Sequence, residues 1–338
     1  MYLLRNATLA DLEDLYELSS KVTFINLPHN KSMIEQKIIK SERSFKSPSK
    51  DLSENYYIFV LEDHKSKKVV GVSMIHAQHG TENEPHFFLR VSQERKYSET
   101  INTGFTHGKL KLGLETDGPT EIGGLVIHPE YRGTGEKLGK QISFVRFLYM
   151  AMHPKRFKKE VHSELMPPFD QEGKAPLWEA IGRRFMAMEY DEADILSRNN
   201  KEFILNLFPS ENIYMTLLPM EARNAVGNVG QDTLPVKAML EKIGFKYINE
   251  VDPFDGGPHY RCDLKEIRPI KNRLLKEIKF SEGLGETRPY LIELKSEDYD
   301  FSAQLVYGLE KDDALYLTPE FKNELTLNTK GKVHAIEL

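Results

Sequence analysis

The sequence has little cysteine, no long apolar run and no strong excess of charge of either sign. Its 338 residues include one cysteine, Cys262, which excludes an intramolecular disulfide framework and a cysteine-rich metal site. The 46 basic and 51 acidic residues give a net charge of −5, which argues against a strongly basic nucleic-acid-binding protein. No apolar stretch approaches the ~18 residues of a membrane span, and no basic segment precedes an apolar stretch at the N-terminus. We therefore expect a cytoplasmic protein with neither a nucleic-acid nor a membrane partner.

What the sequence does contain is the balance of an ordinary globular α/β protein, with 40% hydrophobic and 29% charged residues. Apolar periodicity and turn residues mark its elements. Strands are expected at 2–5, 56–61, 69–75, 120–127, 160–165, 215–218 and 260–264, and helices at 9–18, 32–45, 138–152, 177–185 and 234–243. Residues 78–118 carry no clear periodicity, and beyond Pro269 the pattern changes to short strands and turns. Cys262 falls on a predicted strand, so we expect a structural thiol rather than a nucleophile.

The strongest chemical signal is a glycine-rich turn between the strand at 120–127 and the helix that follows it. Arg132, Gly133 and Gly135 precede this helix, and Gly139 lies in its first turns. Glycine lets the backbone approach a ligand closely, and the first amides of a helix have no intrahelical partner, so they can donate to phosphate oxygens. A tight turn before an ordinary helix would look the same. The Gly-Lys-Ser/Thr ending of a P-loop and the GxGxxG dinucleotide pattern are both absent.

This turn resembles the acyl-CoA pyrophosphate loop of the GNAT acetyltransferase superfamily. Arg132 and Gly135 fit that motif, Lys137 takes its final small position, and Gly139 could replace that small residue. Longer segments are similar to arginine N-succinyltransferases, densely over residues 1–270. They are Phe24–Pro28, Tyr57–Asp63, Val69–Ser73, Arg146–Met150, Pro176–Arg183, Asp191–Asp194, Asp232–Pro235 and Phe254–Pro258.

The resemblance implies transfer of a succinyl group from succinyl-CoA to the α-amino group of L-arginine. It also implies an acetyltransferase-like fold, with a mixed, mostly antiparallel sheet flanked by helices. We expect an acyl-CoA domain at 1–190, a second half completing the acceptor site at 191–268, and a C-terminal β module at 269–338. Leu125 falls where the family binds succinyl-CoA, so we expect Leu125, Arg132, Gly133, Gly135 and Gly139 to bind this co-substrate.

Two positions depart from the family pattern. Gly230 stands where the family has its proton-donating histidine, and Met166 replaces an arginine that follows the family's Glu-Met pair, here Glu164–Leu165. Imidazole exchanges a proton near neutral pH, whereas glycine has no such group. Either the acid–base role has moved, or the chain is weakly active, altered in its acceptor, or a non-catalytic subunit.

Few residues are candidates for the acid–base role that histidine has in the family. Glu121 could act as a base through water or form a buried salt bridge, and His128 could act as a base or cap a turn. Arg90 aligns with a family arginine and could bind a substrate carboxylate or form a structural ion pair. His79, His86 and His107 lie in the unassigned region and could be solvated. No histidine pair at i and i+4 brackets a helical acid, so we expect no metal site.

Three functions therefore remain open. They are an arginine N-succinyltransferase, an acyl-CoA N-acyltransferase with another amine acceptor, and a non-catalytic partner of an active succinyltransferase. The length of the resemblance favours the first, and the missing histidine favours the other two. A homo-oligomer or a hetero-oligomer with a related subunit is compatible with all three.

Overall fold

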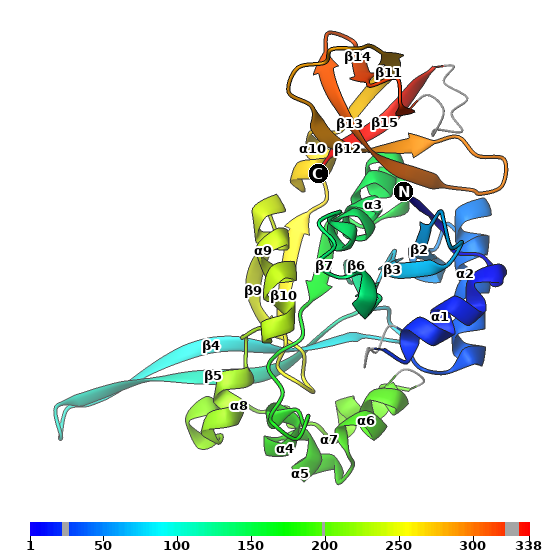
Figure 1. Ribbon diagram of the computed structural model, residues 1–338. Helices are drawn as coiled ribbons and strands as arrows, with labels where there is room; N and C mark the ends of the chain where they lie inside the picture. The colour runs from blue at the N-terminus through cyan, green and yellow to red at the C-terminus, as the bar shows by residue number, and fades with distance from the viewer. Residues whose placement is uncertain (22–26, 198–199, 322–330) are drawn as a thin grey trace. The chain divides into compact units, whose positions relative to one another are not determined.

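The computed structural model describes residues 1–21, 27–197, 200–321 and 331–338, so the first part of the motif Phe24–Pro28 lies outside the described residues. The chain forms two compact units, each built from segments distant in sequence (Figure 1). The first unit contains residues 1–78, 120–159 and 263–338, and the second contains 79–119 and 160–262. The domain boundaries expected at residues 190 and 268 stay a prediction.

The first unit is organised around an extended, mostly antiparallel set of strands. Their order is β12-β15-β11-β14-β13-β1-β2-β3-β6, and the pairing of β11 with β14 is parallel. The bounds are β1 Tyr2–Asn6, β2 Tyr56–Asp63, β3 Val69–His76, β6 Thr120–Ile127, β11 Leu274–Phe280, β12 Arg288–Leu294, β13 Ser302–Lys311, β14 Ala314–Leu317 and β15 Lys332–Glu337. The expected hairpin of β2 and β3 is confirmed, as are strands in the C-terminal tail.

Helices cover this sheet and enclose its core. They are α1 Leu12–Ser19, α2 Lys31–Lys46, α3 Leu138–Met152 and α10 Arg268–Lys271. The apolar stripes of α1 and α2 pack on β2 and β3, where Leu15, Ile38 and Val60 are fully buried. Burying such a side chain contributes about 1.5–3 kcal/mol. Before α1, Thr8 and Asp11 form the expected cap, with the Thr8 N–H donating to Asp11 Oδ2 at 2.8 Å.

The second unit has its own strands, in the order β7-β10-β9-β4-β5-β8. They are β4 His86–Ser98, β5 Thr103–Glu115, β7 Glu160–Glu164, β8 Ile213–Tyr214, β9 Lys246–Val251 and β10 Pro258–Asp263. Its helices are α4 Pro176–Ala180, α5 Gly182–Met186, α6 Tyr190–Ser197, α7 Glu202–Leu207, α8 Met220–Ala225 and α9 Leu234–Ile243. Trp178, Leu177 and Phe254 are among the residues of its core. Cys262 lies buried on β10, as expected of a structural thiol.

Three expectations about elements need correction. The unassigned residues 78–118 form the long hairpin of β4 and β5, which projects as a two-stranded ribbon in Figure 1. The strand expected at 215–218 is a 3₁₀ turn, because the Leu218 N–H donates back to the Met215 carbonyl at 3.0 Å. The helix expected at 177–185 breaks at Ile181, because the φ of −126 and ψ of −73 of this residue are not helical.

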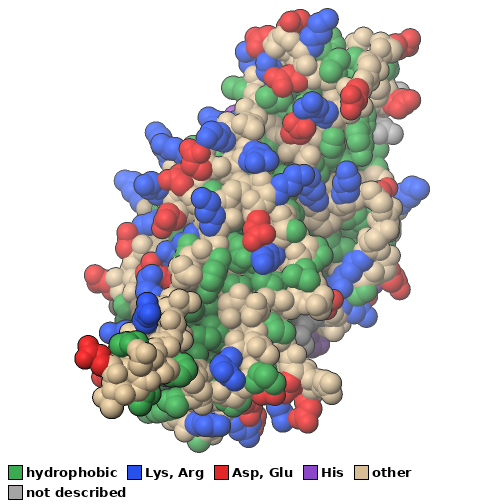
Figure 2. Space-filling model, turned by 90° about the vertical axis from the view of Figure 1, so that its left-hand side faces the viewer, with side chains coloured by type: hydrophobic (Ala, Val, Ile, Leu, Met, Phe, Trp, Pro, Cys, Tyr) green, Lys and Arg blue, Asp and Glu red, His purple; other side chains and the backbone are tan. Residues whose placement is uncertain are grey.

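The α/β class, with a mostly antiparallel sheet flanked by helices, is confirmed. In the face shown in Figure 2, basic and acidic side chains are interspersed rather than gathered by sign. Among the described residues, no helix is both long and apolar enough to cross a membrane.

Candidate functional site

Strand β6, where the family resemblance predicts that the acyl-CoA co-substrate binds, contains a β-bulge. Val72 of β3 is paired with Val126, but Met74 is paired with Gly123, so Gly124 and Leu125 together oppose one residue. Gly124 has φ +57, and a β-carbon there would lie 2.7 Å from Met74 Sδ, so glycine is favoured at this position. A bulge leaves backbone groups outside the strand ladder and is common beside active sites. Leu125 is half-buried next to this feature, which we call the β6 bulge.

Helix α3 holds the β6 bulge from one side. Arg146 Nη1 donates to the Gly123 carbonyl at 3.2 Å, and its other donors bond to Ser143. Arg146 is 2% exposed and has no carboxylate within ion-pair distance among the described residues, and burial lowers its pKa to about 9. In a trans peptide the carbonyl and the next N–H point in opposite directions. The Gly124 N–H is therefore directed away from Arg146.

The predicted phosphate turn, residues 132–139, is open, and at two positions its backbone has the left-handed geometry that favours glycine. Gly133 and Gly135 have φ +72 and +80, and a β-carbon on either would meet nothing within 4 Å. Lys137 is also left-handed, with φ 56, and begins α3 without a side-chain cap. Arg132 Nε donates to the Ile127 carbonyl at 3.0 Å, which ties the turn to the end of β6. Gly139 lies in the first turn of α3 with ordinary helical geometry, so it does not require glycine by conformation.

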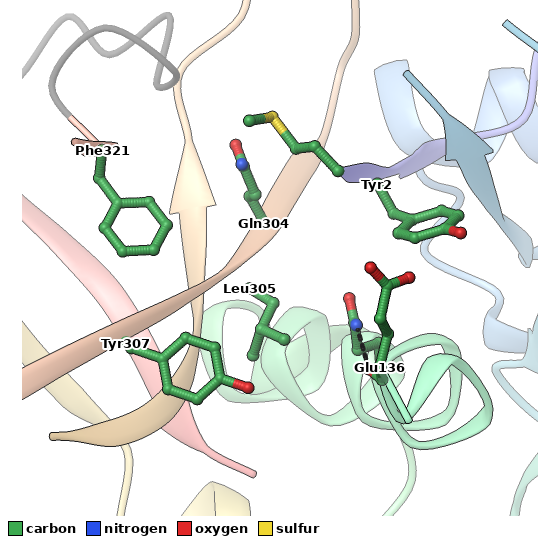
Figure 3. A pocket seen from close by; sticks show the side chains of 8 residues that line it. Tyr2, Glu136, Gln304, Leu305, Tyr307 and Phe321 are labelled. Atoms are coloured by element: carbon green, nitrogen blue, oxygen red, sulfur yellow. Dashed lines mark hydrogen bonds between the residues drawn. The ribbon is translucent and has the colours of Figure 1, made fainter. Parts of the chain in front are cut away.

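A pocket of about 370 Å³ lies in the same unit, at the N-terminal end of α3 (Figure 3). Its lining includes Tyr2 and Glu136 beside Gln304 and Tyr307 of β13. Burial, and then the hydrogen bond and charge of Glu136, raise the pKa of Tyr2 to about 12. The Glu136 carboxylate disfavours an anion in this pocket, and the same charge opposes a diphosphate at the 132–139 turn, to which Glu136 also belongs.

The two predicted acid–base candidates both lie on or next to β6. Glu121 is half-buried and paired in register with His76 of β3. His128 follows the strand, and its Nδ1 accepts from the Glu130 N–H at 3.4 Å, which is the capping role considered from the sequence. A catalytic role for either residue stays a prediction.

Arg90 belongs to an ion-pair network in the second unit. Its Nη2 lies 2.5 Å from Glu250 Oε1, and its guanidinium lies over the Phe88 ring. Glu250 is also 3.4 Å from Arg261, which makes two hydrogen bonds to Glu115 at 3.0 and 2.7 Å. The Arg90 side chain remains 56% exposed, so it can meet a carboxylate as well as Glu250. Its contact with Glu250 is the structural ion pair considered from the sequence.

Gly230 lies at the start of the 3₁₀ turn 231–233 that leads into α9. Its φ of −62 and ψ of 153 are open to any residue. Its N–H donates to the Met166 carbonyl at 2.9 Å, and a β-carbon there would lie 2.9 Å from the Pro167 carbonyl oxygen. The backbone dihedrals therefore permit histidine at this position, but the neighbouring segment leaves little room for its β-carbon.

A cluster that sequence analysis missed lies on three strands of the second unit. His86 of β4, His162 and Glu164 of β7, and His259 of β10 bring one ligand atom each to within 4.8 Å of the others; we call it the His/Glu cluster. The three histidines are at most 2% exposed, and the Glu164 side chain is 30% exposed. The expectation that His86 could be solvated is therefore wrong. A searchable signal existed in His162-Ser163-Glu164, because residues two apart on a strand share a face.

The protonation states in the cluster follow from burial and one hydrogen bond. Burial lowers the pKa of His259 to about 3 and that of His86 well below its usual value, so both rings are neutral at neutral pH. Burial alone would raise the pKa of Glu164, but the hydrogen bond with His162 holds it well below its usual value. The cluster is thus an ionised carboxylate surrounded by imidazoles. Among the described residues, His86 Nε2 and both His259 ring nitrogens have no hydrogen-bond partner.

The chain is similar to arginine N-succinyltransferases over its whole length. The family model described as "Arginine N-succinyltransferase beta subunit" matches residues 2–269. An arginine N-succinyltransferase of Escherichia coli O6:K15:H31 (strain 536 / UPEC) is 31% identical over 343 residues, covering 100% of this chain and 98% of the relative. One from Yersinia pseudotuberculosis serotype O:3 (strain YPIII) is 32% identical over 338 residues, covering 97% and 95%.

A solved structure agrees with these sequence comparisons. The arginine/ornithine succinyltransferase subunit AI of Pseudomonas aeruginosa superposes with a TM-score of 0.85 at 28% identity, covering 100% of this chain and 98% of that one. The match spans both units, with the β6 bulge in one and the His/Glu cluster in the other. The chain belongs to the arginine N-succinyltransferase family.

Proposed function

We propose that this protein transfers the succinyl group of succinyl-CoA to the α-amino group of L-arginine. The observation that supports the proposal most is that the β6 bulge, the turn at Gly133 and Gly135, and helix α3 follow one another in a chain that belongs to this family. Two relatives that it matches nearly end to end bear the name of this reaction.

In the first unit, the backbone supplies the groups that an acyl-CoA thioester needs. The amides at the β6 bulge can donate to the thioester carbonyl, on which negative charge develops during attack. Arg146 fixes the peptide plane at Gly123, so the Gly124 N–H is oriented before substrate binds. The turn at Gly133 and Gly135 and the uncapped start of α3 can take the diphosphate, where helix-dipole stabilisation contributes ~0.3–1 kcal/mol per favourable charge.

The reaction itself needs one new bond and one proton transfer. The neutral α-amine attacks the thioester carbon, the carbon–sulfur bond breaks, and the thiolate leaves as the amide forms. The proton lost by the nitrogen goes to the departing sulfur, directly or through a base. Glu121 and His128 remain the candidates for that base, and Arg90 remains the candidate for a substrate carboxylate. Orientation and electrostatics provide catalysis that does not depend on such a base.

An assembly and a location belong to the same proposal. The family description and the Pseudomonas aeruginosa structure both name a subunit, which supports an oligomer with a further copy or a related chain. The cytoplasmic location expected from the sequence is also part of the proposal.

The test is release of CoA from succinyl-CoA by the purified chain, with and without L-arginine. We expect arginine-dependent thiol release and a succinylated arginine in the mass spectrum. Release that is equal without arginine, or larger with another amine, would refute the proposed acceptor. Binding of CoA without turnover would favour the non-catalytic subunit.

The phosphate site has a separate test with a matched control. Gly135→Ala and Gly135→Asp both place a β-carbon at the left-handed φ of +80, which aspartate tolerates at least as well as alanine, but only the second adds a negative charge. We expect calorimetry to show weaker CoA binding by Gly135→Asp than by Gly135→Ala. Equal affinities would place the diphosphate elsewhere.

A further inference from the structure

We infer that His86, His162, Glu164 and His259 form a binding site for a divalent transition-metal ion of the zinc type. Imidazole nitrogens and a carboxylate oxygen are ligands that Zn²⁺ uses in proteins, almost always four in number in structural sites. Three different strands of one unit deliver these side chains to one point. Their convergence therefore comes from the fold and not from neighbouring positions in the chain.

The distances around Glu164 fit a tetrahedral ion. Its Oε1 lies 3.4 Å from His162 Nε2, 3.6 Å from His259 Nε2 and 3.8 Å from His86 Nδ1. Ligands ~2.0–2.1 Å from a tetrahedral centre lie about 3.3–3.4 Å apart. The distances to Glu164 are close to these values, and all four ligand atoms lie within 4.8 Å of one another, so the side chains have to move inward to close around an ion.

Burial and hydrogen bonding also favour an ion over a packed core. His259 is fully buried, and neither of its ring nitrogens has a hydrogen-bond partner among the described residues. A buried polar group without a partner costs about 1–3 kcal/mol. A metal ion would bind the lone pair of His259 Nε2, which has no hydrogen-bond partner among the described residues. The partly exposed Glu164 gives the ion access from solvent.

One contact has to change when the ion binds. Arg261 Nε donates to His162 Nδ1 at 3.3 Å, which leaves the ring proton on Nε2. Coordination through Nε2 moves that proton to Nδ1 and breaks this long contact. Arg261 keeps its three hydrogen bonds to Glu115 and Glu250, so the exchange leaves its charge compensated.

The experiment measures metal binding by the full chain after treatment with a chelator and dialysis. Titration with Zn²⁺ by calorimetry should give one equivalent per chain. Co²⁺ should give the intense visible absorption of a tetrahedral site with nitrogen and oxygen ligands. Absence of stoichiometric binding by the folded chain would overturn the inference. No acyl-CoA is present, so that result would leave the proposed transfer reaction untouched.

Variants separate this site from adventitious binding. We expect His259→Gln to weaken Zn²⁺ binding by more than the ~10–100-fold that loss of a supporting partner causes. Glu164→Gln keeps the side-chain shape and should also weaken binding, which covers the case in which His259→Gln fails to fold. His64→Gln is the control, because His64 is exposed and lies outside the cluster. Unchanged affinity in folded His259→Gln and Glu164→Gln would mean that the ion is adventitious.

Discussion

Replacing Gly230 by histidine tests whether the acid–base role of the family can be restored in this chain. The backbone at φ −62 accepts any side chain, but the new β-carbon would begin 2.9 Å from the Pro167 carbonyl oxygen. Because this oxygen belongs to the backbone, the segment at Met166 and Pro167 has to shift as a whole, which also strains the Gly230–Met166 hydrogen bond. Overpacking of this kind typically costs ~1–3 kcal/mol.

The expected gain in transition-state stabilisation is larger than the packing cost of the new β-carbon. A positioned acid or base contributes typically ~10²–10⁴-fold, which corresponds to about 2.7–5.5 kcal/mol of transition-state free energy. Gly230→Ala is the matched control, because it meets the same Pro167 contact without an imidazole. Comparing the two variants therefore isolates the chemistry of the ring from the effect of the β-carbon.

The assay is arginine-dependent CoA release, with CoA affinity measured by calorimetry. We expect Gly230→His to turn over at least ~10²-fold faster than Gly230→Ala, with CoA affinity nearly the same in both. Equal turnover of the two variants would refute the reasoning, because the imidazole would then add nothing at this position. Rapid turnover by the wild type, unchanged in Gly230→His, would mean that the proton is handled elsewhere.

Three further predictions concern buried charges. Arg146→Met should keep the fold but lower kcat by ~10²-fold, because the Gly123 peptide loses its tether; an unchanged kcat at saturating substrates would contradict this role. Arg5→Met should lower the free energy of unfolding by about 3–5 kcal/mol in urea titrations, because Asp11 and Glu62 remain buried without their cation. Burial, and then the charge of Glu164, raise the pKa of Asp252 from 3.8 to about 7. The raised pKa means that the folded state favours the protonated form, so stability should fall as pH rises from about 4 through 7. Asp252→Asn should flatten this part of the Tm–pH curve, measured in the presence of a chelator. An unchanged slope would mean that other groups cause the loss of stability.

The elements with a clean period and local end signals could be predicted from sequence. Helix α9 is an example, with Thr233 before its first turn, Pro235 inside it, and Gly244 at φ 116 after it. The hairpin of β2 and β3 was equally clear, because β-branched and aromatic residues fill both strands. In each case the information lies within a few neighbouring residues.

The hairpin of β4 and β5 could not be predicted because its outer part has no buried face. Only the first residues of β4, from His86 to Leu89, are buried, and the positions beyond them are exposed or half-buried on both faces. Alternation of apolar and polar residues requires one face in a core, so the usual strand signal is missing.

The site residues show the same difference between features with a local sequence signal and features that depend on long-range packing. The turn with Gly133 and Gly135 could be found because its residues are contiguous, and both adopt the left-handed geometry that glycine allows. The β6 bulge and its tether to Arg146 depend on pairing register and on a helix that lies above the strand, which no local pattern encodes. The His/Glu cluster depends on three strands, so a search restricted to helical spacing did not find it.

The two departures from the family pattern and the His/Glu cluster all concern how the negative charge of Glu164 is balanced in the second unit. Met166 stands where the family has an arginine, two positions after Glu164, so this chain lacks a cation that the resemblance places near that carboxylate. Imidazoles are present in this unit, but they surround Glu164 instead of occupying position 230. Burial, and then the charge of Glu164, raise the pKa of Asp252, and burial, and then the charge of Asp252, raise that of Asp255, so neither carboxyl can balance the charge of Glu164. A nearby positive charge stabilises a partly buried carboxylate, and a divalent ion held by His86, His162 and His259 would supply it where Met166 cannot.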